Sequence, residues 1–243
     1  MSRFGYAIRE LSAAQKTAKG VSLYSRYVNR PTGRVLAAAG YCAKLTPNQI
    51  TLVSGAFSLA GVVMIAVLRP SPPAAIAIFA VLFLGFALDS ADGQLARLTG
   101  TGSAAGEWLD HVVDCAKMLT LHMAVLVSFY RHFEFSDPRM LLVPVAFQFA
   151  AVMVFFGGIL TEQLKRADRL RSGADRPVPA ASASTVRSAA LLPVDYGVFC
   201  AMFLLFGSRA LFVAAYCCLL GAHVLFMVAF LAKWYRELSV PGR

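Results

Sequence analysis

Four aspartates are the chemically distinctive feature of this sequence, and all lie in LDSADGQLARLTGTGSAAGEWLDHVVDCAKML, residues 88–119. Asp89 and Asp92 are three residues apart, and Asp110 and Asp114 are four apart. On a helix, either spacing places both side chains of a pair on one face. The Gly-rich stretch between the pairs predicts a short link joining two antiparallel helices. We therefore expect the four carboxylates to converge.

Such a cluster needs compensating positive charge. Each charge at membrane depth costs about 2.5–3.5 kcal/mol even on a lenient insertion scale, and the carboxylates also repel one another. Divalent cations would relieve both problems. With oxygen ligands and no His/Cys cluster, the expected ions are hard ones, Mg²⁺ or Mn²⁺. Two ions held by shared carboxylates form a clamp for in-line displacement at phosphorus.

The residues between and beside the aspartates support phosphate chemistry. Gly93 and Gly106 are expected inside helices, where Gly costs about 1 kcal/mol relative to Ala and often marks the close approach of another group. Arg97 offers planar donors to a phosphate or a base. We expect Glu107 to form a charge pair at the start of a helix or to support the metal ligands, rather than to bind metal directly. His111 is read as a packed, hydrogen-bonded histidine, with support of a ligand as the alternative.

The composition shows where these residues must lie. Of the 243 residues, 58% are hydrophobic and 15% are charged, and the mean hydropathy is +0.63. About a quarter of residues are charged in a soluble globular protein. The sequence predicts an all-α integral membrane protein with six transmembrane helices, since about 20 apolar residues cross the hydrocarbon. The spans are expected at about 48–68, 73–96, 105–130, 139–162, 189–206 and 208–234.

The spans are preceded by a basic segment. Residues 20–44 mix apolar residues with arginines and a lysine, which predicts an N-terminal amphipathic juxtamembrane helix at the membrane surface. Pro31 is expected to start or break that helix, and Thr46-Pro47-Asn48 stops it before the first span. The expected organisation is an extension at 1–19, one membrane domain at 20–236 and a tail at 237–243.

The basic residues predict an orientation for six spans. Eighteen of the 23 Lys and Arg residues fall on the side of both termini, and four fall on the other side. Basic residues concentrate in cytoplasmic segments, so both termini and the aspartates are expected on the cytoplasmic face of a cell (plasma or inner) membrane. The net charge of +10 therefore reports topology, and no nucleic-acid partner is expected.

The pattern Asp89-x2-Asp92-Gly93-x2-Ala96-Arg97-x8-Gly106-x3-Asp110-x3-Asp114 matches every fixed position of a family signature. The chain resembles the CDP-alcohol phosphotransferases, also called CDP-alcohol phosphatidyltransferases, over about residues 20–235. This resemblance implies a membrane enzyme that cleaves the pyrophosphate of a CDP-linked alcohol, joins the phosphoryl group to a second alcohol and releases CMP. It also implies that Asp89, Asp92 and Asp110 hold metal, that Asp114 is both ligand and base, and that the protein is a homodimer.

The resemblance also implies the residues that contact the donor. The cytidine-diphosphate contacts of the family correspond to Thr46, Pro47, Asn48, Gln49, Gly93, Arg97 and Ser103. For an acceptor phosphate, the basic cluster around the 163–188 loop offers two candidates. Arg187 precedes the fifth span and is a candidate to face the cavity, and Lys165 is the second candidate.

The leading functional interpretation is phosphatidyl transfer from CDP-diacylglycerol to a small polar alcohol: an inositol phosphate, glycerol phosphate, inositol or serine. A soluble donor such as CDP-inositol is the alternative, because SRYVNRPTGR beside LTPNQIT is similar to family members of that kind. A small transporter or a non-catalytic lipid-binding protein is the alternative of another class. Asp195, a carboxylate within an apolar run, is a functional candidate, with pairing to a loop arginine as the alternative. His122 and His223 are read as packed, hydrogen-bonded residues.

Overall fold

The chain folds as an all-helical bundle in a computed structural model that describes residues 2–13, 21–172 and 184–239. Parts of the predicted extension 1–19 and of the tail 237–243 lie outside these ranges. The described residues contain no strand. The helices are α1 (Arg3–Ala13), α2 (Arg30–Cys42), α3 (Pro47–Val67), α4 (Pro72–Thr99), α5 (Ala104–His132), α6 (Leu142–Arg171), α7 (Thr185–Ala190), α8 (Tyr196–Met202) and α9 (Arg209–Ser239). Short π or 3₁₀ turns occupy Ser25–Asn29, Pro138–Leu141, Leu192–Val194 and Phe203–Leu205.

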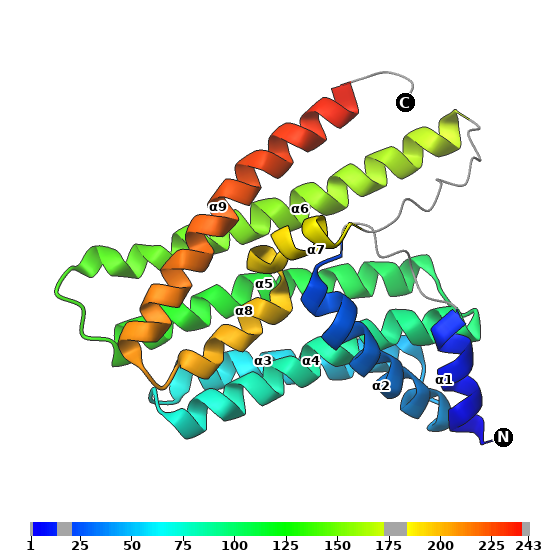
Figure 1. The fold of residues 1–243 in the computed structure, drawn as a ribbon, viewed down its shortest axis with the longest axis horizontal. Coiled ribbons are helices and arrows are strands. Elements are labelled where there is room, and N and C mark those ends of the chain that lie inside the picture. The colour runs from blue at the N-terminus through cyan, green and yellow to red at the C-terminus, as the bar shows by residue number, and fades with distance from the viewer. Residues whose placement is uncertain (1, 14–20, 173–183, 240–243) are drawn as a thin grey trace.

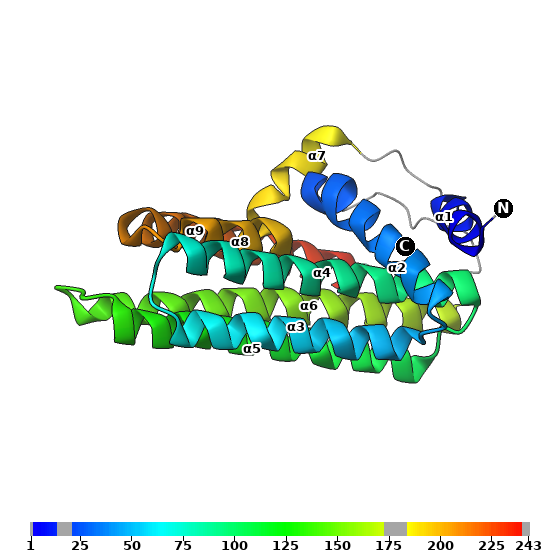
Figure 2. The ribbon, with the colours of Figure 1, turned by 90° about the horizontal axis from the view of Figure 1, so that it is seen from below.

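Five of the helices are long and apolar enough to cross a membrane, counted over the described residues. They are α3, α4, α5, α6 with the turn before it, and α9. Figures 1 and 2 show them running side by side along the length of the molecule. Packing follows a simple order: α3 lies against α4 and α5, α5 lies against α6, and α6 lies against α9.

The fifth predicted span is not one continuous helix. Within 189–206 the chain forms the end of α7, a 3₁₀ turn, α8 and a second 3₁₀ turn, and its apolar helical stretch covers only Tyr196–Leu205. Pro193 and Asp195 explain the break. Proline disfavours continuation of a helix before it, and Asp195 caps α8, with its carboxylate accepting a hydrogen bond from the backbone N–H of Gly197 over 2.7 Å. The described chain therefore shows five long apolar helices and one shorter, broken apolar segment, and the predicted count of six spans is not confirmed.

The segment before the first span is helical over Ser25–Cys42, from a π turn into α2. Pro31 follows directly after the π turn, where its missing N–H interrupts the helical hydrogen-bond pattern. The helix lies over α4 (Figure 2), with Ala37 and Ala38 fully buried. In addition, α1 packs against α2 through Ala7 and Leu11, an element that the sequence analysis did not predict.

The link between α4 and α5 sets the geometry of the aspartates. Helix α4 ends at Gly100, whose φ of 67° lies in the left-handed region that glycine adopts at little cost. Ser103 then caps α5, its hydroxyl accepting a hydrogen bond from the N–H of Gly106 over 3.1 Å. Because the turn between them is short, α5 runs back antiparallel to α4, and α3 packs against both helices (Figure 2).

Most of the apolar core lies away from this turn. It is rich in aromatic rings from α5, α6, α8 and α9, including the fully buried Phe129, Phe147, Phe212 and Tyr216. His122 belongs to this core and its Nδ1 lies 2.7 Å from the hydroxyl of Tyr216, while His223 Nδ1 lies 2.9 Å from the carbonyl oxygen of Leu219. Both histidines are packed and hydrogen-bonded, as the sequence analysis preferred.

Candidate active site

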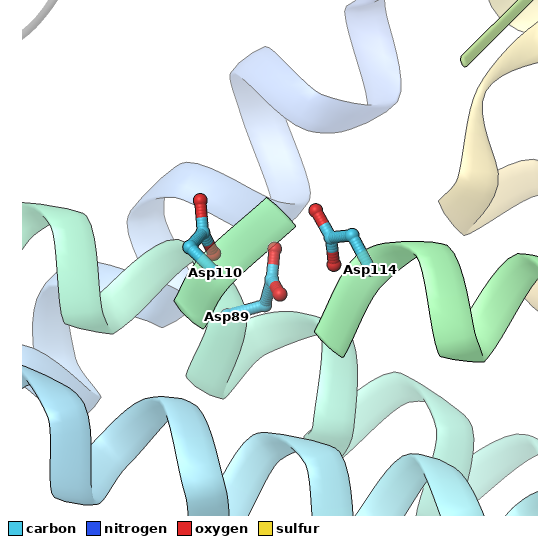
Figure 3. Close-up of side chains that lie close together, drawn as sticks. All are labelled: Asp89, Asp110 and Asp114. Atoms are coloured by element: carbon cyan, nitrogen blue, oxygen red, sulfur yellow. The ribbon is translucent and has the colours of Figure 1, made fainter. Parts of the chain in front are cut away.

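Three of the four aspartates meet between α4 and α5. Asp89 projects from α4, and Asp110 and Asp114 project from α5 (Figure 3). One carboxylate oxygen from each lies within 4.8 Å of the others. The spacing of four on α5 places Asp110 and Asp114 on one face, and the turn at Gly100 brings that face against Asp89.

The fourth aspartate, Asp92, is held slightly apart from this group. It is buried, with 6% of its surface exposed, and its Oδ2 accepts a 2.6 Å hydrogen bond from the hydroxyl of Thr51 on α3. Its Oδ1 lies 2.5 Å from the backbone nitrogen of Gly93. The structure thus brings three carboxylates into one cluster and fixes Asp92 on the next turn of α4.

Lys117 is part of the site, and the sequence analysis gave it no role there. Its Nζ lies 2.5 Å from Asp89 Oδ1 and 3.0 Å from Asp114 Oδ1. It also donates to the hydroxyl of Ser54 over 3.2 Å. A lysine three residues after Asp114 inside an apolar span was the available signal, because this spacing places both side chains on one face.

A polar cavity of about 200 Å³ opens beside the carboxylates. It is lined by Arg30, Asp89, Ser90, Asp92, Gly93, Gln94, Arg97 and Asp110. Asp114 is not among these residues and lies one helical turn beyond Asp110. Arg30, from the first turn of α2, is a lining residue that the sequence analysis read only as part of a basic surface helix. The cavity therefore combines carboxylates with two guanidinium groups, a pairing suited to metal ions and phosphates together.

The donor set suits hard divalent cations. Carboxylate oxygens from Asp89, Asp110 and Asp114 lie close enough to share an ion, and Asp92 faces the same cavity. Oxygen-only ligation favours Mg²⁺ or Mn²⁺ over softer metals. The arrangement thus fits a divalent metal next to an anionic substrate.

Comparison with known proteins identifies the family. Residues 44–234 match the sequence profile of the CDP-alcohol phosphatidyltransferases. The chain belongs to the CDP-alcohol phosphatidyltransferase family. The match contains all four aspartates, Gly93, Arg97 and Gly106.

A curated relative of this family member is named CDP-diacylglycerol--serine O-phosphatidyltransferase, from Encephalitozoon cuniculi (strain GB-M1). The two are 34% identical over 112 residues. That similarity covers 36% of this chain and 29% of the relative, so the chain spans less than a third of the relative's length.

The two signature glycines of this CDP-alcohol phosphatidyltransferase family member have different surroundings. A Cβ on Gly106 would lie 3.1 Å from Asn48 Oδ1 and 3.3 Å from Ser103 Oγ, so a methyl group at the start of α5 would crowd the start of α3. A Cβ on Gly93 would meet only Arg97 Nη1, at an ordinary 3.5 Å. The protein itself leaves space at Gly93, on the wall of the cavity.

The predicted donor contacts at 46–49 form the N-terminal cap of α3. Thr46 accepts a hydrogen bond from the N–H of Gln49 over 3.3 Å, and the Gln49 side chain accepts one from the N–H of Thr46 over 2.8 Å. Pro47 begins the helix. This reciprocal capping box fixes the end of α3 beside Gly106. Ser103 likewise caps α5, so both sets of residues have a clear structural role, and their contact with a donor remains a prediction.

The two acceptor candidates are found on α6 and α7. Lys165 is on α6 and pairs with Glu237 of α9. Arg187 is an exposed residue of α7. Neither is among the residues that line the described cavity, and their role in binding an acceptor stays a prediction.

Two other residues singled out from the sequence have structural partners. Glu107 accepts hydrogen bonds from Gln163 over 3.1 Å and from Arg166 over 3.2 Å, which ties the start of α5 to α6. For Glu107, the sequence analysis preferred charge pairing or support of the metal ligands to direct metal binding, and the pair with Arg166 is such a charge pair. His111 is half-buried on α5 next to Asp110.

Asp195 connects the juxtamembrane segment to α8. Besides capping α8, its Oδ2 accepts hydrogen bonds from the hydroxyls of Ser22 and Ser25, the latter over 2.6 Å. Its partners among the described residues are thus two serine hydroxyls and the backbone N–H groups of Gly197 and Val198. Pairing with a loop arginine, the predicted alternative to a functional role, is not seen among them. Tyr24 packs on Gly197, and burial, with smaller effects of Cys200 and Asp195, raises the pKa of its hydroxyl to about 12.

Proposed function

We propose that this protein is a metal-dependent phosphatidyltransferase that moves a phosphatidyl group from CDP-diacylglycerol to the hydroxyl of a small polar alcohol and releases CMP. The observation that carries the proposal is the juxtaposition of the Asp89, Asp110 and Asp114 carboxylates with a polar cavity that also presents Arg97. Family membership and the long apolar helices support it.

The residues divide into three tasks in this reaction. Asp89, Asp92, Asp110 and Asp114 are expected to hold two divalent cations, Mg²⁺ or Mn²⁺, which would neutralise the pyrophosphate when bound. Arg97 is placed to bind the negative oxygens of the pyrophosphate through its planar N–H donors. Gly93 leaves room on the cavity wall for the donor. The capped starts of α3 and α5, with Thr46, Asn48 and Ser103, are expected to contact the cytidine end.

The chemical step is a direct displacement. The acceptor hydroxyl oxygen bonds to the phosphorus that carries the diacylglycerol, while the bond from that phosphorus to the bridging oxygen breaks. That oxygen leaves with its electron pair as part of CMP, and Asp114 takes the hydroxyl proton as general base. No covalent enzyme intermediate is needed.

The diacylglycerol donor is favoured over a soluble one. A donor with acyl chains can remain in the bilayer beside the long apolar helices while its head group enters the polar cavity. The relative named for CDP-diacylglycerol and serine supports this choice and makes serine the first acceptor to test. We further propose that the cavity opens at the cytoplasmic face of the cell membrane and that the enzyme is a homodimer.

A direct assay tests the proposal. Purified protein in lipid nanodiscs would receive CDP-diacylglycerol or CDP-inositol with Mg²⁺ or Mn²⁺, each paired with serine, inositol, inositol phosphate or glycerol phosphate. CMP release and the mass of the product lipid would be measured. We expect metal-dependent CMP release from CDP-diacylglycerol. Activity only with CDP-inositol would select the soluble donor, and no cleavage of either donor would favour a transporter or a lipid-binding protein.

A further inference from the structure

Lys117 lies at the closed end of the carboxylate cluster. It is on α5, one turn deeper than Asp114, with 7% of its side chain exposed. An ammonium has three N–H donors, and three acceptors surround this one: Asp89 Oδ1, Asp114 Oδ1 and the hydroxyl of Ser54. Every donor of the lysine therefore has a partner.

The hydrogen-bond network around the lysine joins three helices. Ser54, on α3, accepts from Lys117 and donates its own hydroxyl proton to the backbone carbonyl of Gly85 on α4 over 2.9 Å. Asp89 is on α4 and Asp114 is on α5. The position of the ammonium is thus fixed from all three sides, and it fixes the two carboxylates in return.

This position has an electrostatic consequence for the proposed metal site. Buried carboxylates without a cation would repel one another and face a large desolvation cost. The Lys117 ammonium, hydrogen-bonded to Asp89 and Asp114, supplies one positive charge within the cluster. The same charge repels an incoming divalent cation, since charges a few ångströms apart inside a protein interact strongly. The lysine therefore stabilises the metal-free site and weakens metal binding.

We propose that Lys117 is a positioning residue that acts as a built-in counter-cation of the catalytic carboxylates. It binds one oxygen of Asp89 and one of Asp114, which leaves the second oxygen of each for the side of the proposed metal ions. Because of it, the cluster keeps its arrangement without metal, and divalent ions bind more weakly than the carboxylates alone would dictate. The inference rests on the proposed metal site.

Removal of the charge at constant side-chain length tests this role. Purified wild type, Lys117→Met and Lys117→Arg would be compared for Mn²⁺ affinity, from the electron paramagnetic resonance signal of free Mn²⁺, and for Tm in EDTA and in Mn²⁺. Lys233→Met is the matched control, because Lys233 is an exposed lysine of α9 that pairs with Glu237.

The expected results concern metal binding and stability. Wild type should remain folded in EDTA. Lys117→Met should bind Mn²⁺ about tenfold more tightly or better. Its Tm in EDTA should fall by about 5 °C or more, and Mn²⁺ should recover most of that loss. Lys117→Arg and Lys233→Met should bind Mn²⁺ as wild type does.

The outcomes separate this inference from the proposed function. Absence of Mn²⁺ binding to wild type would contradict the proposed metal site itself. Normal binding to wild type with unchanged affinity and Tm response in Lys117→Met would overturn the role of Lys117 alone. If Lys117→Met does not fold, the double variant Lys117→Met/Asp89→Asn, which removes one charge of each sign, should fold in EDTA. Failure of that variant would show that the lysine is needed for packing and would also overturn the inference.

Discussion

Thr51 Oγ1 on α3 lies 2.6 Å from Asp92 Oδ2 on α4, and both side chains are buried. This contact crosses the interface of two long helices and fixes the one signature aspartate that stands outside the three-carboxylate cluster. Asp92 has no freedom to turn away from the cavity while the bond is present.

Thr51→Val keeps the shape of the side chain and removes this bond. A hydrogen bond to a charged group contributes about 1.5–3 kcal/mol, so we expect kcat/KM for CMP release to fall by about tenfold or more. Thr120→Val is the matched control, because the Thr120 hydroxyl bonds, within the part of the chain that the structure describes, only to backbone carbonyls of its own helix. Equal activity of the two variants would contradict a role for Thr51 in holding Asp92.

Asp114→Asn tests the general base. An amide cannot take the proton of the acceptor hydroxyl, and general bases contribute about 10²–10⁴-fold to rate. We expect kcat for CMP release to fall by about a thousandfold with a folded protein. Glu107→Gln, on the same helix and paired with Arg166, should retain activity within about threefold. Substantial turnover by Asp114→Asn at saturating metal would show that Asp114 is not the general base.

Arg30→Gln tests the contribution of the juxtamembrane helix to donor binding. Arg30 lines the cavity together with Arg97, so an anionic donor bound there would lie beside both guanidinium groups. We expect the KM for the CDP-linked donor to rise about tenfold, with a smaller change in kcat. Arg34→Gln, one turn further along α2 and bonded to Ser12, is the control. The same KM in both variants would show that Arg30 does not contact the donor.

Gly93→Ala tests whether glycine at this position is needed to leave space for a ligand or for the stability of the fold. The new methyl group meets only Arg97 Nη1 at 3.5 Å, and alanine favours a helix interior by about 1 kcal/mol. We expect an unchanged or higher Tm together with a clear rise in donor KM. Gly106→Ala should raise Tm less than Gly93→Ala does, because its methyl group would crowd Asn48 Oδ1 and Ser103 Oγ. A Gly93→Ala enzyme with normal KM would show that the donor does not use this wall.

The sequence could predict the carboxylate cluster because its determinants are local. Spacings of three and four set the helix faces, and the Gly-rich link at 100–102 sets the antiparallel turn. The partners of Lys117 and Asp92 could not be predicted in this way. They depend on Ser54 and Thr51 of α3, whose register against α4 and α5 is fixed by packing and leaves no periodic signal.

Two further features could not be predicted from the sequence, for similar reasons. Arg30 reaches the cavity because α2 lies over α4, whereas its sequence shows only a basic amphipathic pattern typical of a surface helix. The break in the predicted span 189–206 depends on Asp195, and composition alone does not reveal a helix cap within an apolar run. Its serine partners lie about 170 residues earlier in the chain.

Asp195→Ala tests whether this carboxylate holds the juxtamembrane segment in place. The variant loses the cap of α8, about 1 kcal/mol, and the bonds from Ser22 and Ser25. We expect a lower Tm and faster amide hydrogen exchange at 24–29. Asp137→Ala is the control, since Asp137 caps an exposed 3₁₀ turn and has no partner of this kind among the described residues.

The same variant should also affect the donor. Arg30 directly follows the turn Ser25–Asn29, so loosening that turn from α8 moves the guanidinium that lines the cavity. We expect Asp195→Ala to raise donor KM in the same direction as Arg30→Gln, and the double variant to add little to either change, because residues that act through one contact are not additive. Additive effects on KM, or unchanged exchange at 24–29, would mean that Asp195 stabilises α8 without positioning Arg30.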